Sequence, residues 1–106
     1  MKTNTAHYLA EIARISDLER AAGREPSALV TNTAAAITKG DALKAHANAL
    51  ADLSAKTTDV RGRALVMLAC HATHAERFAR TNKAQFQAES ERDADAEIRI
   101  YANLSI

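Results

Sequence analysis

Residues 60–106 contain no proline, and their only glycine, Gly62, falls in the first turn of any helix that begins there. Three glycines and one proline interrupt a whole chain dominated by alanine, leucine, glutamate, lysine, arginine and glutamine, which have high helix propensity. Only Ile98 and Ile100 alternate as in a strand, and no second strand candidate could pair with them. We therefore predict an all-α fold, an antiparallel bundle of four to five helices with one long helix in the C-terminal half.

Large apolar side chains are scarce in this sequence. Leu, Ile, Val and Phe together fill 20 of the 106 positions, whereas alanine alone fills 25. So low a share indicates disorder only when the net charge is high, and 14 Lys and Arg against 13 Asp and Glu leave a net charge of +1. We expect one folded domain over residues 1–106 with a thin core, and no basic surface of the kind that binds polyanions in general.

Turn and cap residues divide the first half of the chain into three expected helices. The first covers about residues 5–22 and ends before Gly23. The second covers about residues 26–39, because Pro26 suits a first helical turn, although Thr31, Asn32 and Thr33 lower its propensity. The third covers about residues 41–55, with Asp41 as its N-cap.

The long helix is expected over about residues 59–88. At about 1.5 Å per residue it would span roughly 45 Å, whereas a compact domain of this size has a diameter of roughly 33 Å. Either the helix breaks near Thr81-Asn82, where the apolar pattern is interrupted, or one end protrudes. Its expected buried side consists of Ala64, Leu65, Leu68, Ala72, Ala75, Phe78, Ala79 and Phe86.

Ser90, with Asp93 three residues later, resembles a capping box and predicts a short final helix that begins there. A long helix that protruded would leave Phe86 in water, at a cost of ~1.5–3 kcal/mol relative to burial. A second copy of the chain would remove that cost, and symmetric dimers are the commonest oligomers. We expect a homodimer that associates through the C-terminal half, with a tightly packed monomer as the alternative.

Charge is unevenly distributed over the second half of the chain. Residues 57–88 have a surplus of three positive charges, and residues 89–106 a deficit of three. This pattern is typical of ordinary helix ends, where basic side chains favour the last turn and acidic ones the first. It also fits a basic flank and an acidic flank that meet a partner of opposite charge. The residues expected to form an interaction surface are Arg77, Phe78, Arg80, Lys83, Phe86, Ile98, Tyr101 and Leu104.

Cys70, His71 and His74 form the only cluster of potential metal ligands or nucleophiles. Zinc requires three or four such ligands in tetrahedral geometry, and the helix places only Cys70 and His74 together on one flank. A catalytic thiolate needs an oriented base in a pocket. We therefore expect no metal, no cofactor and no enzymatic activity, and we interpret Cys70 as a buried thiol and His46 as a core or boundary residue.

The alternative function is DNA binding. Residues 15–30 loosely resemble a helix-turn-helix, in which Gly23 ends one helix and Pro26 opens the next. Arg24 occupies an expected apolar turn position, and the face that would contact DNA, including Thr31 and Asn32, carries no Arg or Lys. A nucleic-acid partner is therefore a weaker expectation than a protein partner.

These observations favour a non-enzymatic protein–protein interaction module, a small regulator, adaptor or inhibitor. Compact helical chains of mixed charge are frequent among bacterial and phage regulators, although no residue identifies the source or the partner. The longest uncharged apolar runs are far shorter than the ~20 residues of a membrane span, and residues 1–5 lack the apolar core of a secretory signal. We expect a cytoplasmic protein with no membrane partner.

Overall fold

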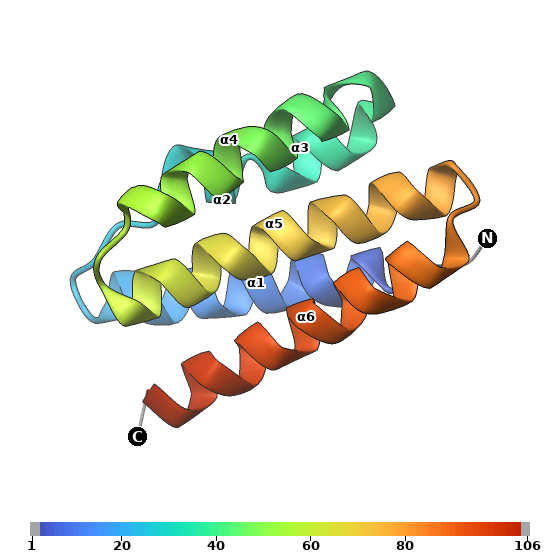
Figure 1. Ribbon diagram of the computed structural model, residues 1–106. Coiled ribbons are helices and arrows are strands. Elements are labelled where there is room, and N and C mark those ends of the chain that lie inside the picture. Colours follow the sequence, from blue (N-terminus) through green and yellow to red (C-terminus); the bar gives the residue numbers. More distant parts are fainter. Residues whose placement is uncertain (1–2, 105–106) are drawn as a thin grey trace.

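The computed structural model describes residues 3–104, which form an all-α fold as expected (Figure 1). Within this range no strand occurs, and the bundle has six α-helices rather than four or five. The helices are α1 (Thr5–Ala21), α2 (Ala28–Thr31), α3 (Thr33–Thr38), α4 (Leu43–Lys56), α5 (Val60–Arg80) and α6 (Ala84–Leu104), and a 3-10 turn, η1 (Gly40–Ala42), precedes α4.

Helix α5 is the central element, and α4, α6 and α1 all pack against it. Figure 1 shows α4, α5 and α6 side by side, with α1 behind them and the short α2 and α3 behind α4. The buried side of α5 consists largely of alanine, which lets neighbouring helices approach closely. The fully or nearly fully buried alanines of α5 are Ala64, Ala69, Ala72, Ala75 and Ala79. Larger side chains from α1 and α4, notably Ile15 and Leu50, fill the remaining space.

The expected long helix is broken, and the break falls at Thr81–Asn82, the first of the two alternatives. Asn82 has a φ of 56°, the left-handed conformation that ends many helices. Its N–H donates to the Ala79 carbonyl oxygen (3.2 Å), and the N–H of Lys83 donates to that of Phe78 (2.8 Å). These two bonds define a Schellman motif. The turn reverses the chain, so that neither half exceeds the 39 Å length of the molecule.

The expected capping box at Ser90 is wrong, because α6 begins at Ala84 and Ser90 lies inside it as a buried residue. Once the chain has turned at Asn82, residues 84–88 continue directly into α6 and need no second start signal. The same helix includes Ile98 and Ile100, so the strand alternative is also wrong.

The second expected helix is divided at Asn32 into α2 and α3. Threonine hydroxyls bond to nearby carbonyls there, with Thr31 donating to Ala28 and Thr33 to Leu29 (both 3.2 Å). Such local bonds compete with a continuous helix. Pro26 precedes the helix, and the N-cap is Ser27. Likewise, Asp41 lies in η1 and does not cap α4.

Two tyrosines connect α1 to α6 across the bundle. The Tyr8 hydroxyl donates to the Asp95 carboxylate (3.0 Å) and to the Glu91 carbonyl oxygen (3.1 Å). From the other end, the Tyr101 hydroxyl donates to Glu19 (3.0 Å), whose buried carboxylate also accepts from Arg24 (2.6 Å). These bonds hold α6 in place against α1, because the two helices share little other packing.

Asn82 offers a direct test of the turn. Alanine at position 82 would have to adopt the same left-handed backbone conformation, in which its Cβ lies too close to the following carbonyl oxygen. We therefore expect Asn82→Ala to lower the free energy of unfolding by about 1 kcal/mol. Asn82→Gly, which has no such steric cost, should be close to or above the wild type. Urea denaturation measures both, with Lys83→Ala as the control because Lys83 has no positive φ. Equal stability of Asn82→Ala and the wild type would contradict this account of the turn.

Candidate protein-interaction surface

Two columns of side chains, one on α5 and one on α6, run along one outer face of the α5–α6 hairpin. We call the two columns together the hairpin face. The α5 column consists of Val60, Arg63, Met67, His71, His74 and Phe78. The α6 column consists of Phe86, Glu89, Asp93, Glu97 and Ile100. Spacings of three and four residues place each set on one side of its helix. Every member is partly or fully exposed, whereas the alanines of α5 are directed into the core.

Aromatic rings cluster at the end of the hairpin face nearest the turn. The ring centroids of Phe78 and Phe86 lie 5.4 Å apart, and His74 stacks on Phe78 at 5.9 Å. The Arg77 guanidinium lies 4.7 Å from the Phe78 centroid, within cation–π range. Phe86 remains 51% exposed. The expectation that Phe86 lies on the buried side of one long helix is therefore wrong; the helix breaks before it, and the hairpin, not a protruding helix end, leaves it exposed.

Aliphatic side chains occupy the opposite end of the hairpin face. Val60 is 56% exposed and Ile100 is 43% exposed. With Met67 they line a shallow groove of about 250 Å³, which Arg63 and Glu97 also border. Sequence reasoning missed these three apolar residues. The seven-residue spacing of Val60, Met67 and His74 was the available signal.

The two columns carry opposite charge. The α5 column has the cation Arg63, with Arg77 at its edge, and the α6 column has three carboxylates, of Glu89, Asp93 and Glu97. Burial raises the pKa of Glu97, and nearby Arg63 opposes that shift. Within residues 3–104, no charged side chain of either column forms an ion pair within 4.0 Å. The charges of this face are thus available to a partner.

Several residues expected on the surface lie elsewhere. Arg80 is exposed, but its guanidinium already pairs with Glu76 (3.2 Å) and donates to the carbonyl oxygen of Ile37 within the same chain. Tyr101 is 4% exposed and belongs to the core, and Ile98 packs against that core. Lys83 is exposed in the turn, and Leu104 is partly buried at the end of α6. Buried apolar residues cannot form a surface, so the hairpin face retains Phe78 and Phe86 from the expected set, with Arg77 at its edge.

The acidic run of α6 is only partly free for a partner. Glu91 accepts hydrogen bonds from Asn4 (2.7 Å) and Gln87 (3.0 Å), and Asp95 accepts from Tyr8. These two carboxylates therefore hold α6 to α1, and the hairpin face carries the others.

The Cys70 cluster has a structural environment. The Cys70 thiol is buried, lies 3.6 Å from the Ala47 carbonyl oxygen and donates to it, and burial raises its pKa. His46 is hydrogen-bonded to the Thr33 hydroxyl at 3.1 Å. In the part of the chain that the structure describes, no three His, Cys, Asp or Glu side chains gather as metal ligands would.

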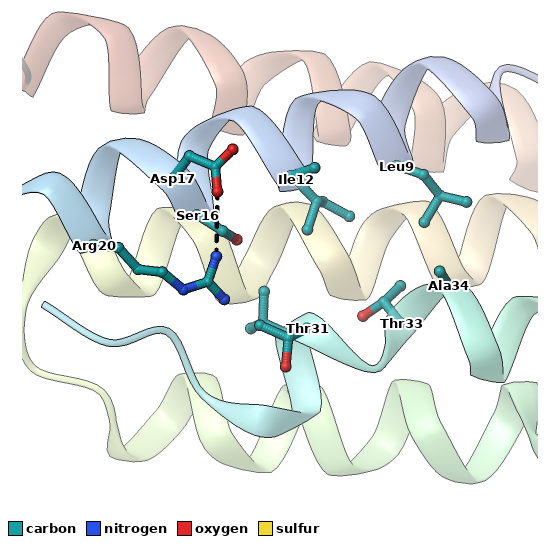
Figure 2. Close-up of a pocket in the computed structure, with 10 residues that line it drawn as sticks. Leu9, Ile12, Ser16, Asp17, Arg20, Thr31, Thr33 and Ala34 are labelled. Atoms are coloured by element: carbon teal, nitrogen blue, oxygen red, sulfur yellow. Dashed lines mark hydrogen bonds and ion pairs between the residues drawn. The ribbon is translucent and has the colours of Figure 1, made fainter.

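A second hollow, of about 210 Å³, lies between α1 and the α2–α3 segment (Figure 2). Its walls are mainly apolar, and the ion pair of Asp17 with Arg20 (3.3 Å) spans its edge. Among residues 3–104 the Ser16 hydroxyl, which is buried, has no hydrogen-bond partner, and the hydroxyls of Thr31 and Thr33 already bond to carbonyls. This hollow therefore presents apolar contact with little polar recognition.

The segment that resembles a helix-turn-helix forms no continuous second helix. The positions that would contact DNA fall on the four-residue α2 and on Asn32, where the chain breaks into α3. No protein-family model matches this chain, and neither a curated protein nor a solved structure is detectably similar to it. None of the helices within residues 3–104 combines the length and apolar character needed to cross a bilayer.

Three partly buried histidines make stability depend on pH. Burial lowers the pKa of His46, His71 and His74; Asp93 opposes this shift at His71, and Arg77 reinforces it at His74. In the unfolded chain these histidines have the ordinary pKa near 6.5, so as the pH falls the unfolded chain takes up protons at a higher pH than the folded chain does. The free energy of unfolding is therefore greatest above pH 6.5 and decreases below it.

We therefore expect the urea midpoint to decrease between pH 7.5 and pH 5.5 (roughly one unit either side of the ordinary histidine pKa). The double variant His71→Gln, His74→Gln should show a smaller decrease, whereas a variant of the exposed His7 should behave as the wild type. A midpoint that rises on acidification would be incompatible with this environment.

Cys70 should be unreactive in the folded protein. Because only local or global opening exposes the thiol, we expect its reaction with Ellman's reagent to be at least about a hundredfold slower in buffer than in denaturant. Equal rates in the two solutions would show that the thiol is accessible and would contradict its buried environment.

Proposed function

We propose that this protein is a non-enzymatic protein–protein interaction module, a small regulator, adaptor or inhibitor that acts by docking its hairpin face on a protein partner. One observation carries this proposal. In a chain with few large apolar residues, Val60, Phe86 and Ile100 remain about half exposed on one face, beside charges of both signs that form no ion pair within residues 3–104. Single exposed apolar residues are common, whereas apolar groups gathered at both ends of one face, with charged side chains between them, are typical of binding sites.

The energetics favour a partner with a matching apolar surface. About half of each of these three side chains is already buried, so complete burial of each contributes on the order of 1 kcal/mol. Association costs at least ~4 kcal/mol of translational and rotational freedom. The partner must therefore also cover Met67 and Phe78 and pair with the charges, which makes the face selective for a complementary surface.

The surroundings of the polar groups near this face support a binding role over catalysis. The Cys70 thiol is directed at a carbonyl oxygen inside the bundle, and its raised pKa disfavours the nucleophilic thiolate. The imidazole of His74 is stacked on Phe78, and its Nδ1 atom is buried. These groups stabilise the packing beneath the face.

Site-specific photo-crosslinking in cells tests the proposal. A benzophenone amino acid at position 86 should give covalent adducts with protein, and adding Ile100→Asp should abolish them because a buried charge disfavours docking. Leu18 is the matched control, because it is also a large apolar residue, 46% exposed, but lies on α1 away from the hairpin face. No adduct from position 86, or the same adducts from position 18, would refute the proposal.

A further inference from the structure

The identity of the partner rests on the proposed function of the hairpin face. We infer that the partner is a second copy of this chain, and that the two copies form a two-fold symmetric four-helix arrangement in which α5 of each lies antiparallel against α6 of the other. The basis is the order of side chains along the two columns, which makes the face complementary to itself.

Residues of the two columns lie at matching levels along the hairpin. Phe78 and Phe86 are in ring contact at 5.4 Å at one end. His71 and Asp93 are near enough to influence each other electrostatically in the middle. Arg63 and Glu97 influence each other in the same way beyond them and share the groove that Val60 and Ile100 line. Each level thus pairs one α5 residue with one α6 residue of similar or opposite character.

A two-fold axis parallel to the helices keeps each residue at the same height along the helices. It places α5 of one copy opposite α6 of the other. Phe78 then faces Phe86 of the second copy, and Val60 faces its Ile100. In the charged levels, Arg63 faces Glu97 of the second copy, and His71 faces its Asp93. At these four levels apolar groups meet apolar groups, the Arg63 cation meets the Glu97 carboxylate, and the imidazole of His71 meets the Asp93 carboxylate as a hydrogen-bond donor. An isologous interface requires this kind of self-complementarity.

The other face-to-face arrangement is electrostatically unfavourable. A two-fold axis across the helices would stack α5 on α5 and α6 on α6. Asp93 would then lie near Asp93 of the second copy, and Glu97 near its Glu89, and like charges brought together at an interface oppose association. The opposite charges of the two columns therefore select the arrangement with α5 against α6.

The size of the face indicates a weak, reversible dimer. The α5 column rises about 27 Å from Val60 to Phe78, and two packed helices are about 19 Å wide, so the face projects roughly 500 Å². A standard interface buries about 800 Å² on each partner. We expect a dimer with a micromolar dissociation constant.

Sedimentation equilibrium between about 1 and 200 µM, which brackets a micromolar constant, tests this inference. The wild type should approach twice the 11.4 kDa mass of one chain at the upper end. Arg63→Glu and Glu97→Lys should each weaken the dimer at least about tenfold, because each sets two like-charged pairs across the interface. Mixed together, these two variants should associate. In the mixed dimer the introduced carboxylate of one chain faces the introduced ammonium of the other, and the unchanged Glu97 faces the unchanged Arg63.

Arg99→Glu is the matched control, because it makes the same charge change as Arg63→Glu but lies on α6 about 200° around the helix from Glu97. This variant should dimerise as the wild type does. Circular dichroism verifies that each variant folds. Restored association on mixing supports the inference specifically, because the like-charged pair within each chain remains. Variants that dimerise as the wild type does, or a mixture that stays monomeric, would overturn the proposed geometry.

The crosslinks from position 86 separate the two claims. Adducts of twice the chain mass support the second copy as partner. If the wild type remains a single chain throughout and position 86 crosslinks to a different protein, the second-copy inference fails and the proposed function stands. If position 86 gives no adduct and the wild type remains a single chain, both fail.

Discussion

The alanine-lined side of α5 is the constraint on which the rest of the structure depends. Because Ala69, Ala72 and Ala75 occupy little space, α1, α4 and α6 can all approach one central helix. Buried alanine contributes little transfer free energy, so the flanking helices must supply the large side chains, such as Ile15 and Leu50. Polar bonds add to this packing where it is weakest, as between α1 and α6. The result is a narrow bundle that covers three sides of α5 and leaves the fourth open.

The open side explains the location of the candidate surface. A chain with a thin core would be expected to bury its few large apolar residues, yet Phe86 at one end of the hairpin face and Val60 and Ile100 at the other remain exposed. The basic side chains lie on α5 and the acidic ones on α6, and the described part of the chain, residues 3–104, holds no ion pair between them. Such a surface is unfavourable for an isolated monomer and useful for one that docks, which is the physical reason for which we propose a binding role.

Much of the fold could be predicted from the sequence, and the errors have local causes. The predicted buried set on α5 is correct for Ala64, Leu68 and Ala72, because helical periodicity identifies the side that avoids water. The break at Asn82 was one of two alternatives, since length alone showed that an unbroken helix would not fit. The sequence pattern predicts the start of α6 at Ser90, six residues too late, because a serine followed three residues later by an acidic residue also occurs in the interior of helices. Of the candidate surface, Phe78 and Phe86 were identified, whereas Met67 was missed.

The sequence by itself determined the helical class, the approximate helices and the side of α5 that is buried, because propensity and periodicity are properties of neighbouring residues. Only the tertiary structure decided which apolar residues remain exposed. Tyr101 and Ile100 are adjacent on α6, yet one is buried against Glu19 of α1 and the other is exposed beside Val60. Periodicity shows which residues share a side of a helix, but whether another helix covers that side depends on where the chain turns. Asn82, in the left-handed backbone conformation, sets the turn between α5 and α6.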